Sequence, residues 1–434
     1  MTHGGVKLAI NFSKLQSYDV YAWDIYHTMK QEQKKELQDN NIKLVDENFL
    51  KENKPFTVAP IHCKLNHPVD MTHHEAVACL IEKEINIPVI EVTGVKGKTS
   101  VVHMLKEIYK DFNPLILSSL GIEVRKNNKW LLLERDVSIT PSNIITAWES
   151  GQEYNSEIFI TETSLGGTGL AQVGVLTNII EDYPIVSGQK TASQAKVQIF
   201  KNKLVCCDYK SYQKFYTQFD EKTNTFGLTQ GNVRVKNVAY GLTKTFLNIK
   251  VEGLKTVSGE ILEKEFQIGT FAPAPHHVEN VLSAISAALS CGISIETIQS
   301  GLKDFKGIKG RTSLKNIDDT VIIEEINPGI NVTAVKKAIE MVKELPQSLV
   351  IFGGQYGVTC EEIDEIEVLE VLNLIDEDIR LILTDELGEN LKNGIKRSFR
   401  YIEDYIEAVE QAHKEGYQHV LLVYRSNYPS IEHR

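Results

Sequence analysis

Residues 89–106 read VIEVTGVKGKTSVVHMLK and constrain the fold of this chain more than any other stretch. An apolar, β-branched run at 89–93 lies between Pro88 and Gly94, which predicts a short buried strand. Apolar residues then recur at helical spacing from 101 to 108. The stretch therefore predicts a strand, a glycine turn and a helix in direct succession.

This turn suits a phosphate group. A helix N-terminus offers unpaired backbone N–H groups and the positive end of the helix dipole. Lys98 would add a mobile positive charge, and the hydroxyl of Thr99 is suited to the magnesium ion that accompanies ATP. The residues expected to bind nucleotide here are Gly94, Val95, Lys96, Gly97, Lys98, Thr99 and Ser100.

The spacing of the glycines differs from the usual phosphate loop. Only Val95 and Lys96 separate Gly94 from Gly97, whereas the usual pattern has four residues there. An ordinary strand-to-helix turn is the alternative, and glycines alone would fit it. The flanking strand and helix, together with the contiguous Gly-Lys-Thr-Ser, favour phosphate binding.

Composition limits the class of protein. A chain of 434 residues suggests about three domains. The net charge of −11 argues against a nucleic-acid binder, and no apolar run approaches the ~18 residues of a membrane helix. We therefore expect a cytosolic protein that contacts neither nucleic acid nor membrane. The six cysteines are scattered without metal-ligand spacing and are expected to be free thiols.

Apolar runs alternate with amphipathic stretches along the chain, which indicates α/β architecture. We expect a Rossmann-like substrate-binding domain at 1–88, a central ATP-binding domain with a parallel sheet at 89–312, and a Rossmann-like domain at 313–434. Gly4 and Gly5 stand where a βα turn would follow a strand that this sequence lacks. Either the natural start lies upstream of Met1 or the first domain has no such strand.

The motifs resemble the Mur ligase superfamily, which includes the ATP-dependent peptide ligases of cell-wall synthesis and folylpolyglutamate synthetase. The short-spaced loop Thr93–Ser100 matches the phosphate loop of that family. By the same match, Glu162 corresponds to a magnesium ligand, and Lys196 to a lysine that is carbamylated in many members. The resemblance thus implies ATP and Mg²⁺ as cofactors, with Lys98, Glu162 and Lys196 as catalytic residues and Thr99, Glu162 and Lys196 as metal ligands.

Three later motifs extend the resemblance. Residues 177–183 are similar to a Thr-Asn-x-x-x-Asp-His segment, with Tyr183 in place of the histidine. The helix start at 276–280 resembles the family's adenine-binding segment, which implies that Asn280 contacts the base. Arg311 and Glu325 correspond to nucleotide contacts of the last domain. The resemblance implies transfer of the γ-phosphate to a substrate carboxylate, and attack of a nucleophile on the acyl phosphate.

Within the superfamily, the chain resembles the branch that acts on a nickel tetrapyrrole acid in methanogenic archaea. The similar stretches are residues 1–5, 59–63, 71–77 and 162–169. This resemblance implies that a tetrapyrrole propionate closes a carbocycle within the same molecule. His62, His67, His73 and His74 are near one another in sequence and are candidates to contact the macrocycle, although loop histidines are more often plain surface residues.

The sequence leaves two alternative functions open. A peptide ligase of archaeal pseudomurein would have the same ATP-binding residues and differ in its first and last domains. A ligase-like protein that only binds nucleotide would have little use for the full set of Lys98, Thr99, Glu162 and Lys196. We expect an enzyme, and a monomer is the favoured oligomeric state.

Overall fold

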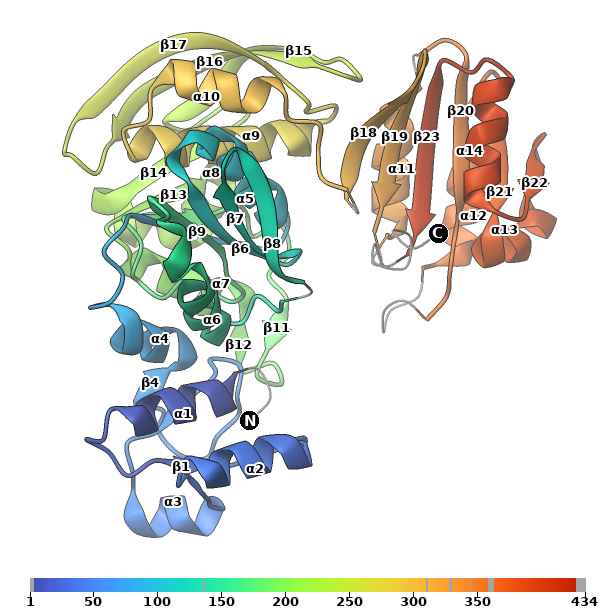
Figure 1. Ribbon diagram of the computed structural model, residues 1–434. Helices are drawn as coiled ribbons and strands as arrows, with labels where there is room; N and C mark the ends of the chain where they lie inside the picture. Colours follow the sequence, from blue (N-terminus) through green and yellow to red (C-terminus); the bar gives the residue numbers. More distant parts are fainter. Residues whose placement is uncertain are drawn as a thin grey trace. The chain divides into compact units, whose positions relative to one another are not determined.

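The computed structural model describes residues 4–135, 137–309, 311–327, 330–343, 345–357 and 363–426. Residues 1–3 of the similar stretch 1–5, one of the six cysteines (Cys360) and Gly310 lie outside these ranges. Within them the chain is α/β, as predicted, with one large and one smaller sheet in which parallel pairs predominate (Figure 1). Its contacts divide it into two compact units, which are described separately.

Unit 1 comprises Met1–Asn237, Asn248–Ile268 and Glu279–Leu302. Its sheet has the strand order β17-β16-β15-β14-β13-β10-β5-β9-β6-β7-β8. The strands are β5 (Val89–Thr93), β6 (Pro114–Ser118), β7 (Gly121–Lys126), β8 (Lys129–Arg135), β9 (Ile158–Glu162), β10 (Val173–Leu176), β13 (Leu204–Asp208), β14 (Thr223–Gly227), β15 (Val233–Ala239), β16 (Thr245–Lys255) and β17 (Ile261–Thr270).

The middle of this sheet brings the predicted site residues to one edge. Strands β5, β6, β9, β10 and β13 are buried at every position, as their continuous apolar runs predict for parallel strands covered on both faces. Strand β5 pairs in parallel with β9 on one side and β10 on the other. The carboxyl ends of these strands therefore meet at one edge, where open α/β sheets bind ligands.

Helices cover both faces of the sheet in unit 1 (Figure 1). The helices of unit 1 are α1 (Gly5–Lys14), α2 (Gln31–Asp39), α3 (Glu47–Asn53), α4 (His73–Ile81), α5 (Lys98–Ile108), α6 (Ser142–Gly151), α7 (Ala192–Lys196), α8 (Tyr209–Ser211), α9 (Pro275–Ser290) and α10 (Ile295–Lys303). Short 3₁₀ or π turns occupy Lys110–Phe112, Gln152–Tyr154, Val197–Lys201 (η3), Tyr212–Tyr216 and Thr217–Lys222. Leu8 of α1 and Val77 of α4 share a core with Ile144 and Trp148 of α6 and with Phe159 of β9.

The first 88 residues carry less sheet than a Rossmann-like domain. They contain two pairs of two-residue parallel strands, β1 (Tyr21–Ala22) with β2 (Lys43–Leu44) and β3 (Val58–Ala59) with β4 (Met71–Thr72). Residues 19–24 read DVYAWD and predict a strand, but β1 is short because the Asp24 carboxylate accepts the backbone N–H of Met29 at 2.8 Å and turns the chain. A small separate core of Val6, Ala9, Ile10, Ala22, Met29, Leu37 and Ile42 holds this segment together.

A further short antiparallel pair in unit 1 is formed by β11 (Pro184–Ile185) and β12 (Lys190–Thr191). Gly4, at φ +89°, directly precedes helix α1. This is the turn position that the sequence analysis gave to Gly4 and Gly5. A Cβ at Gly4 would lie 1.8 Å from Ser142 Oγ, so the close approach of α1 to α6 requires a glycine there.

Unit 2 comprises Val238–Leu247, Gly269–Val278 and Lys303–Arg434. Its sheet has the order β18-β19-β23-β20-β21-β22 and is parallel except for the pair β18–β19. The strands are β18 (Thr312–Ile317), β19 (Thr320–Ile326), β20 (Ser348–Gly354), β21 (Arg380–Thr384), β22 (Arg400–Ile402) and β23 (His419–Arg425). Helices α11 (Val332–Glu340), α12 (Glu365–Asn373), α13 (Asp385–Leu391) and α14 (Tyr405–Lys414) and the 3₁₀ turn Lys392–Gly394 complete it.

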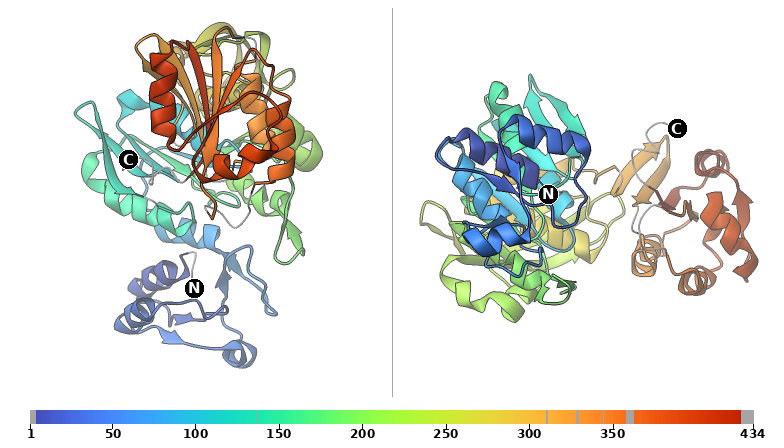
Figure 2. Two further views of the ribbon diagram at one scale, coloured as in Figure 1. Left: turned by 90° about the vertical axis from the view of Figure 1, so that its right-hand side faces the viewer. Right: turned by 90° about the horizontal axis from the view of Figure 1, so that it is seen from below.

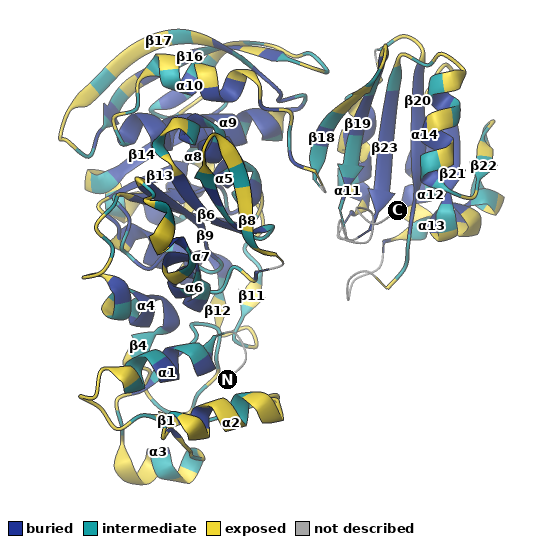
Figure 3. Cartoon of the chain, in the orientation of Figure 1, coloured by how far each residue is buried: buried dark blue, intermediate teal, exposed yellow. Residues whose placement is uncertain are grey.

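Alternate residues of these strands enter two different cores. Val350 and Phe352 of β20 pack with α11, α12 and α13, whereas Leu349 and Ile351 pack with α14. Helices accordingly cover both faces of the sheet (Figure 2), and β20 and β23 are buried along nearly all their length (Figure 3). Apolar runs at 321–323, 349–352, 381–383 and 420–423 predict four strands, and β19, β20, β21 and β23 confirm them. The division into domains at 88 and 312 stays a prediction, because compactness separates the chain into two units at other positions.

Candidate nucleotide and metal site

The phosphate loop in unit 1 has the backbone that its glycines predict. Gly94 and Gly97 have φ angles of +143° and +85°, and Gly97 precedes the first residue of α5. A Cβ at Gly94 would lie 1.9 Å from Thr177 Oγ1, and one at Gly97 would lie 2.2 Å from Asn280 Oδ1. Both positions therefore need glycine for the close approach of other segments as well as for the turn.

Thr177 and Asn178, which follow β10, hold the loop from its side. The N–H of Val95 donates to the Asn178 carbonyl at 3.0 Å, and the N–H of Lys96 donates to Asn178 Oδ1 at 3.2 Å. Thr177 Oγ1 donates to the Lys96 carbonyl at 2.6 Å. These bonds occupy polar groups in the first half of the loop and fix its path toward the amides of the first turn of α5, which have no acceptor within the helix.

Thr99 and Glu162 lie together at the carboxyl edge of the sheet. Thr99 Oγ1 is 3.1 and 3.0 Å from the two carboxylate oxygens of Glu162, which is only 2% exposed. Ser119 completes the group, because its N–H donates to Glu162 Oε2 at 3.0 Å and its hydroxyl is 3.1 Å from Thr99 Oγ1. A carboxylate and two hydroxyls are hard oxygen donors of the kind that Mg²⁺ prefers, so these residues fit that ion.

Ser119 was not predicted from the sequence. Its signal was present, since it directly follows the apolar strand β6, which neighbours β9 in the sheet. Polar residues at the carboxyl end of a buried parallel strand are placed at the ligand edge. Which strands are neighbours, however, is decided by the fold and not by the local sequence.

Lys196 ends helix α7 and is 2% exposed. Burial, and to a smaller degree the positive charge of Lys98, lowers the pKa of its ammonium group to about 7. Among the residues that the structure describes, no carboxylate lies within ion-pair distance of Lys196. A substantial fraction of this lysine is therefore a neutral amine near pH 7, in contrast to an exposed lysine.

Asp182 positions the helix that carries Lys196. Its carboxylate accepts the N–H of Ser193 at 2.7 Å and the Ser193 hydroxyl at 2.8 Å, which caps the start of α7. The carbonyl of Tyr183 accepts the N–H of Ala192 at 2.9 Å. The motif at 177–183 thus supports both the phosphate loop and the lysine helix through its first and last residues.

Unit 1 contains a hollow of about 60 Å³. It is lined by Pro60, Ile61, His62, His73, His74, Thr140, Pro141, Ser164 and Leu165. His74 Nε2 is 2.8 Å from the Ser164 carbonyl, and His74 Nδ1 is 3.3 Å from Gln198 Nε2, so Nε2 carries the proton and Nδ1 accepts. Burial is the main cause that lowers the pKa of His74 to about 4, and Lys196 adds to it.

Three of the four histidines named as candidates to contact the macrocycle therefore line one hollow, whereas His67 does not line it. Among the described residues, no three histidine, cysteine or acidic side chains converge in a way that would hold a metal ion. The hollow thus offers imidazole rings, of which that of His74 is kept neutral by burial. It lies near the metal residues, since Ser164 follows Glu162 by two positions.

The remaining predicted residues are divided between the two units. Asn280, on α9, lies against Gly97 in unit 1. Arg311 and Glu325 lie in unit 2, where Thr312 Oγ1 donates to Glu325 Oε2 at 2.7 Å and His277 Nε2 is 3.1 Å from Thr312 Oγ1. Burial raises the pKa of Glu325 to about 7, although Thr312 and the charge of Arg311 oppose that rise. The nucleotide roles of these residues stay predictions.

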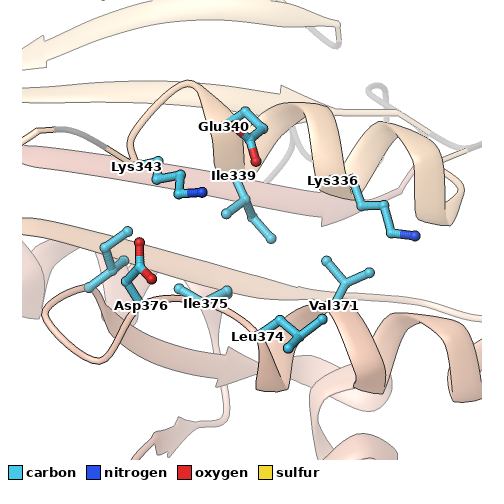
Figure 4. A pocket seen from close by; sticks show the side chains of 9 residues that line it. Lys336, Ile339, Glu340, Lys343, Val371, Leu374, Ile375 and Asp376 are labelled. Carbon is cyan, nitrogen blue, oxygen red and sulfur yellow. The ribbon is translucent and has the colours of Figure 1, made fainter.

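A second hollow, of about 240 Å³, lies between α11 and α12 in unit 2 (Figure 4). Its walls are apolar, with Lys336, Glu340, Lys343 and Asp376 at the edges. None of the residues predicted to bind nucleotide or metal lines it. Its two positive and two negative groups balance, so charge gives it no preference for an anion or a cation.

Comparison with known proteins confirms the predicted resemblance. The family model of the C-terminal domain of the coenzyme F430 synthetase CfbE matches residues 314–427. The coenzyme F(430) synthetase of Methanocaldococcus jannaschii is 29% identical over 425 residues, covering 94% of each chain. That of Methanosarcina acetivorans is 26% identical over 462 residues, covering 95% of this chain and 94% of its own.

Solved structures confirm the predicted fold. MurF ligase from Thermotoga maritima, in complex with ADP, has a TM-score of 0.55 at 14% identity and covers 88% of each chain. A pseudomurein peptide ligase type C from Methanothermus fervidus has a TM-score of 0.52 at 16% identity, covering all of this chain and 97% of its own. In the part of this chain that the structure describes, no helix has the length and apolar character to span a membrane.

Replacing Glu162 with Gln should weaken metal binding beside the loop. The amide can still accept the N–H of Ser119, but it lacks the charge that a divalent cation needs. Calorimetric titration of Mg²⁺ in the presence of ADP should show an affinity at least ~100-fold lower than in the parent protein. Glu157→Gln, an exposed change just before the same strand, is the matched control. Unchanged Mg²⁺ affinity in Glu162→Gln would contradict the assignment.

Replacing Glu325 with Gln should change how stability depends on pH. The folded state holds a proton on Glu325 up to about pH 7, whereas the ordinary value is 4.5, so this group's contribution to stability is lost as pH rises through that window. Gln has no such loss. As pH rises from 5 to 8, the free energy of unfolding of the variant should therefore increase by roughly 1–3 kcal/mol relative to that of the parent. Urea unfolding at both pH values measures this, with exposed Glu370→Gln as control. If variant and parent differ in their free energy of unfolding by the same amount at pH 5 and pH 8, the prediction is wrong.

Proposed function

We propose that this chain, which is similar to coenzyme F(430) synthetases over nearly its whole length, is an ATP-dependent ligase of the Mur type. Its reaction is the activation of a carboxylate of a nickel tetrapyrrole acid as an acyl phosphate, followed by closure of a carbocycle. The observation that carries this proposal is the group of Thr99, Ser119 and Glu162 beside the phosphate loop, in a chain with these relatives.

The loop would bind the phosphates of ATP. The amides at the start of α5 point their N–H groups toward that end of the helix, and Lys98 adds a positive charge for the outer phosphates. The ADP complex of MurF, which has the same fold, supports the choice of nucleotide. Asn280 would contact the adenine from its place against Gly97, and in unit 2 Arg311 and Glu325 would make further nucleotide contacts.

Thr99, Ser119 and Glu162 would hold Mg²⁺, and Lys196 as a carbamate would supply an oxygen for a second ion. Such ions neutralise the charge that develops on the transferred phosphoryl group. Glu162 accepts from two donors, the Thr99 hydroxyl and the N–H of Ser119, and therefore keeps a fixed orientation before any ion arrives.

Lys196 is chemically prepared for carbamylation. Its neutral amine can attack CO₂, so that an N–C bond forms, one proton leaves, and the product carries an anionic carboxylate. The pKa of about 7 makes the reactive amine abundant at neutral pH. The modification would convert a cation close to Lys98 into an anion, which removes the repulsion between the two lysines.

The substrate carboxylate would approach from the hollow lined by His73, His74 and Ser164. The carboxylate oxygen attacks the γ-phosphorus and ADP leaves. A carbon of the same molecule then attacks the acyl carbonyl, a C–C bond forms, that carbon loses a proton and phosphate departs. No amino acid is consumed, and exclusion of water protects the acyl phosphate from hydrolysis.

A pseudomurein peptide ligase is the second candidate, because such a ligase from Methanothermus fervidus has the same fold over the whole chain. It would use the same nucleotide site, and an amine in place of the carbon nucleophile. The curated relatives, with 26–29% identity, favour the tetrapyrrole reaction. A cytosolic location and a monomeric state stay predictions.

Phosphate release from ATP distinguishes the two reactions. With the open-ring nickel tetrapyrrole acid alone, we expect one phosphate per product and the loss of one water mass from the tetrapyrrole. Lys98→Ala should lower kcat by roughly 10²–10³-fold, because a positive charge on the transferring phosphoryl group is removed. Exposed Lys83→Ala should behave like the parent. Release that requires an amino acid would instead identify a peptide ligase.

Carbamylation of Lys196 can be measured directly. In ¹³C-labelled bicarbonate, NMR should show one carbamate carbon whose intensity rises with pH from 6 to 8, since the lysine pKa of about 7 lies in that range. Lys196→Met should lose the signal, whereas Lys201→Met should retain it. A carbamate signal that survives in Lys196→Met would place the modification elsewhere.

A further inference from the structure

Glu91 is a buried acid in the middle of the large sheet of unit 1. It lies on β5, two residues before the phosphate loop motif begins, and is 1% exposed. Apolar residues are usual in a parallel strand that is covered on both faces. Among the described residues, no cation lies within ion-pair distance of its carboxylate. Its charge is therefore stabilised by hydrogen bonds alone, and the nucleotide and metal contacts described above do not use it.

The donors to Glu91 come from two separate segments. The N–H of Thr168 donates at 2.9 and 3.0 Å to the two carboxylate oxygens, and the Thr168 hydroxyl also donates. The N–H of Gly169 is 3.3 Å from Glu91 Oε2. From the second segment, Asn202 Nδ2 donates to Glu91 Oε2 at 2.9 Å, while Asn202 Oδ1 accepts the N–H of Ala171 at 2.8 Å. A buried carboxylate needs several donors of this kind.

The first of these segments is the loop 163–169, which continues directly from Glu162. Its N–H groups also bond to the strand that precedes the phosphate loop, Thr163 to the Val92 carbonyl at 2.9 Å and Gly166 to Thr93 Oγ1 at 3.2 Å. A Cβ at Gly167 would lie 2.7 Å from Glu91 Oε2, so the loop passes as close to the carboxylate as glycine permits.

The second segment is the one that carries Lys196. Asn202 directly follows η3, which continues from α7. The loop touches the same helix, because the Leu165 carbonyl accepts Gln198 Nε2 at 3.2 Å and a Cβ at Gly166 would lie 3.1 Å from the Ala195 carbonyl. Glu91 therefore joins three segments, which bear Thr99, Glu162 and Lys196 respectively.

We propose that Glu91 is a positioning residue for the metal site, which sets the distance between Glu162 and Lys196 by fixing the loop 163–169 and Asn202 to strand β5. This inference rests on the proposed function of Glu162 and Lys196 as metal-binding groups. Glu91 itself contacts neither metal nor nucleotide. Its role is to hold Glu162 and Lys196 at the spacing that two metal ions require. Without this support, the ions would have to move the two groups into place, and their binding affinity would be lower.

The test is metal binding, which needs no tetrapyrrole. Mn²⁺ binding is measured by electron paramagnetic resonance in the presence of ADP and bicarbonate, and ADP binding without metal is measured by calorimetry. Glu91→Gln should weaken Mn²⁺ binding by roughly 10–100-fold and change metal-free ADP binding less than about 3-fold. Exposed Glu84→Gln is the matched control and should bind both like the parent.

A double variant that exchanges the donor and the acceptor between positions 91 and 202 makes the test specific. In Glu91→Gln, the new NH₂ group faces the NH₂ of Asn202 or the donors of Thr168. Adding Asn202→Asp supplies an acceptor for that NH₂ and still accepts the N–H of Ala171. The double variant should recover Mn²⁺ affinity to within about 3-fold of the parent, because the hydrogen bonds between the same positions are restored in the opposite direction.

Thr168→Val provides a milder variant in case Glu91→Gln folds poorly. It removes only the hydroxyl donor and keeps the side chain's shape, and Mn²⁺ affinity should fall by about 3-fold or more. Three results would overturn the inference. One is a lower melting temperature in Glu91→Gln with unchanged Mn²⁺ affinity, which would leave a purely structural role. Another is lost affinity that the double variant does not recover. The third is a Thr168→Val protein that binds Mn²⁺ like the parent.

The outcomes separate this inference from the proposed function. If the parent binds Mn²⁺ with ADP and the variants behave as described, the positioning role stands even where no tetrapyrrole is converted. If the parent protein binds no Mn²⁺ with ADP, the metal site of the proposed function and this inference both fail. If turnover succeeds but Glu91→Gln binds Mn²⁺ normally, only this inference fails.

Discussion

The hydrogen bonds between the phosphate loop and the Thr177–Asn178 turn are the contacts on which the rest of the site depends. They join the carboxyl ends of two neighbouring parallel strands, β5 and β10, and occupy polar groups of Val95 and Lys96. Because those groups are paired within the protein, the loop keeps one path into α5. The approach is so close that only glycine fits at positions 94 and 97. A preformed loop of this kind loses little entropy when phosphate binds.

Buried charge is the second constraint. Glu91, Glu162 and Lys196 are all nearly inaccessible to solvent, and Glu91 and Glu162 lie on the neighbouring strands β5 and β9. The two carboxylates are satisfied by hydroxyl and amide donors, whereas the lysine lowers its pKa to about 7. These are the two ways in which a protein interior accommodates an ionisable group without an opposite charge. The consequence is an oxygen-rich group around Glu162 and a buried lysine amine that is partly neutral near pH 7.

Burial sets the protonation state of two histidines, His74 and His277. His74 and His277 have pKa values lowered mainly by burial, so each acts as a neutral ring with one donor and one acceptor. His277 lies in a chain of polar contacts with Thr312 and Glu325 in unit 2, where burial raises the pKa of the acid. His74, one of the four candidates to contact the macrocycle, thus lines a small hollow as a hydrogen-bonding group, whereas His277 belongs to a polar network in unit 2.

Much of the fold and part of the site could be predicted from sequence, because their signals are local. The strand, glycine turn and helix at 89–106 follow from apolar periodicity and from the conformations that glycine permits, and the strands of unit 2 follow from short apolar runs. Glu162 and Lys196 were predicted as site residues from their likeness to family motifs. Residues 1–88 were predicted less well, because one turn at Asp24 was enough to shorten the expected strand.

Only the tertiary structure decided which strands are neighbours, and hence which side chains meet. Ser119 joins Thr99 and Glu162 because β6 lies beside β9, and Glu91 receives donors from Thr168 and Asn202 because the chain returns twice to β5. The depressed pKa of Lys196 likewise depends on burial by segments far away in sequence. The sequence by itself determined the local elements and the motif residues. Long-range packing decided the neighbours, the charge states and the positioning contacts, because these depend on distance in space and not along the chain.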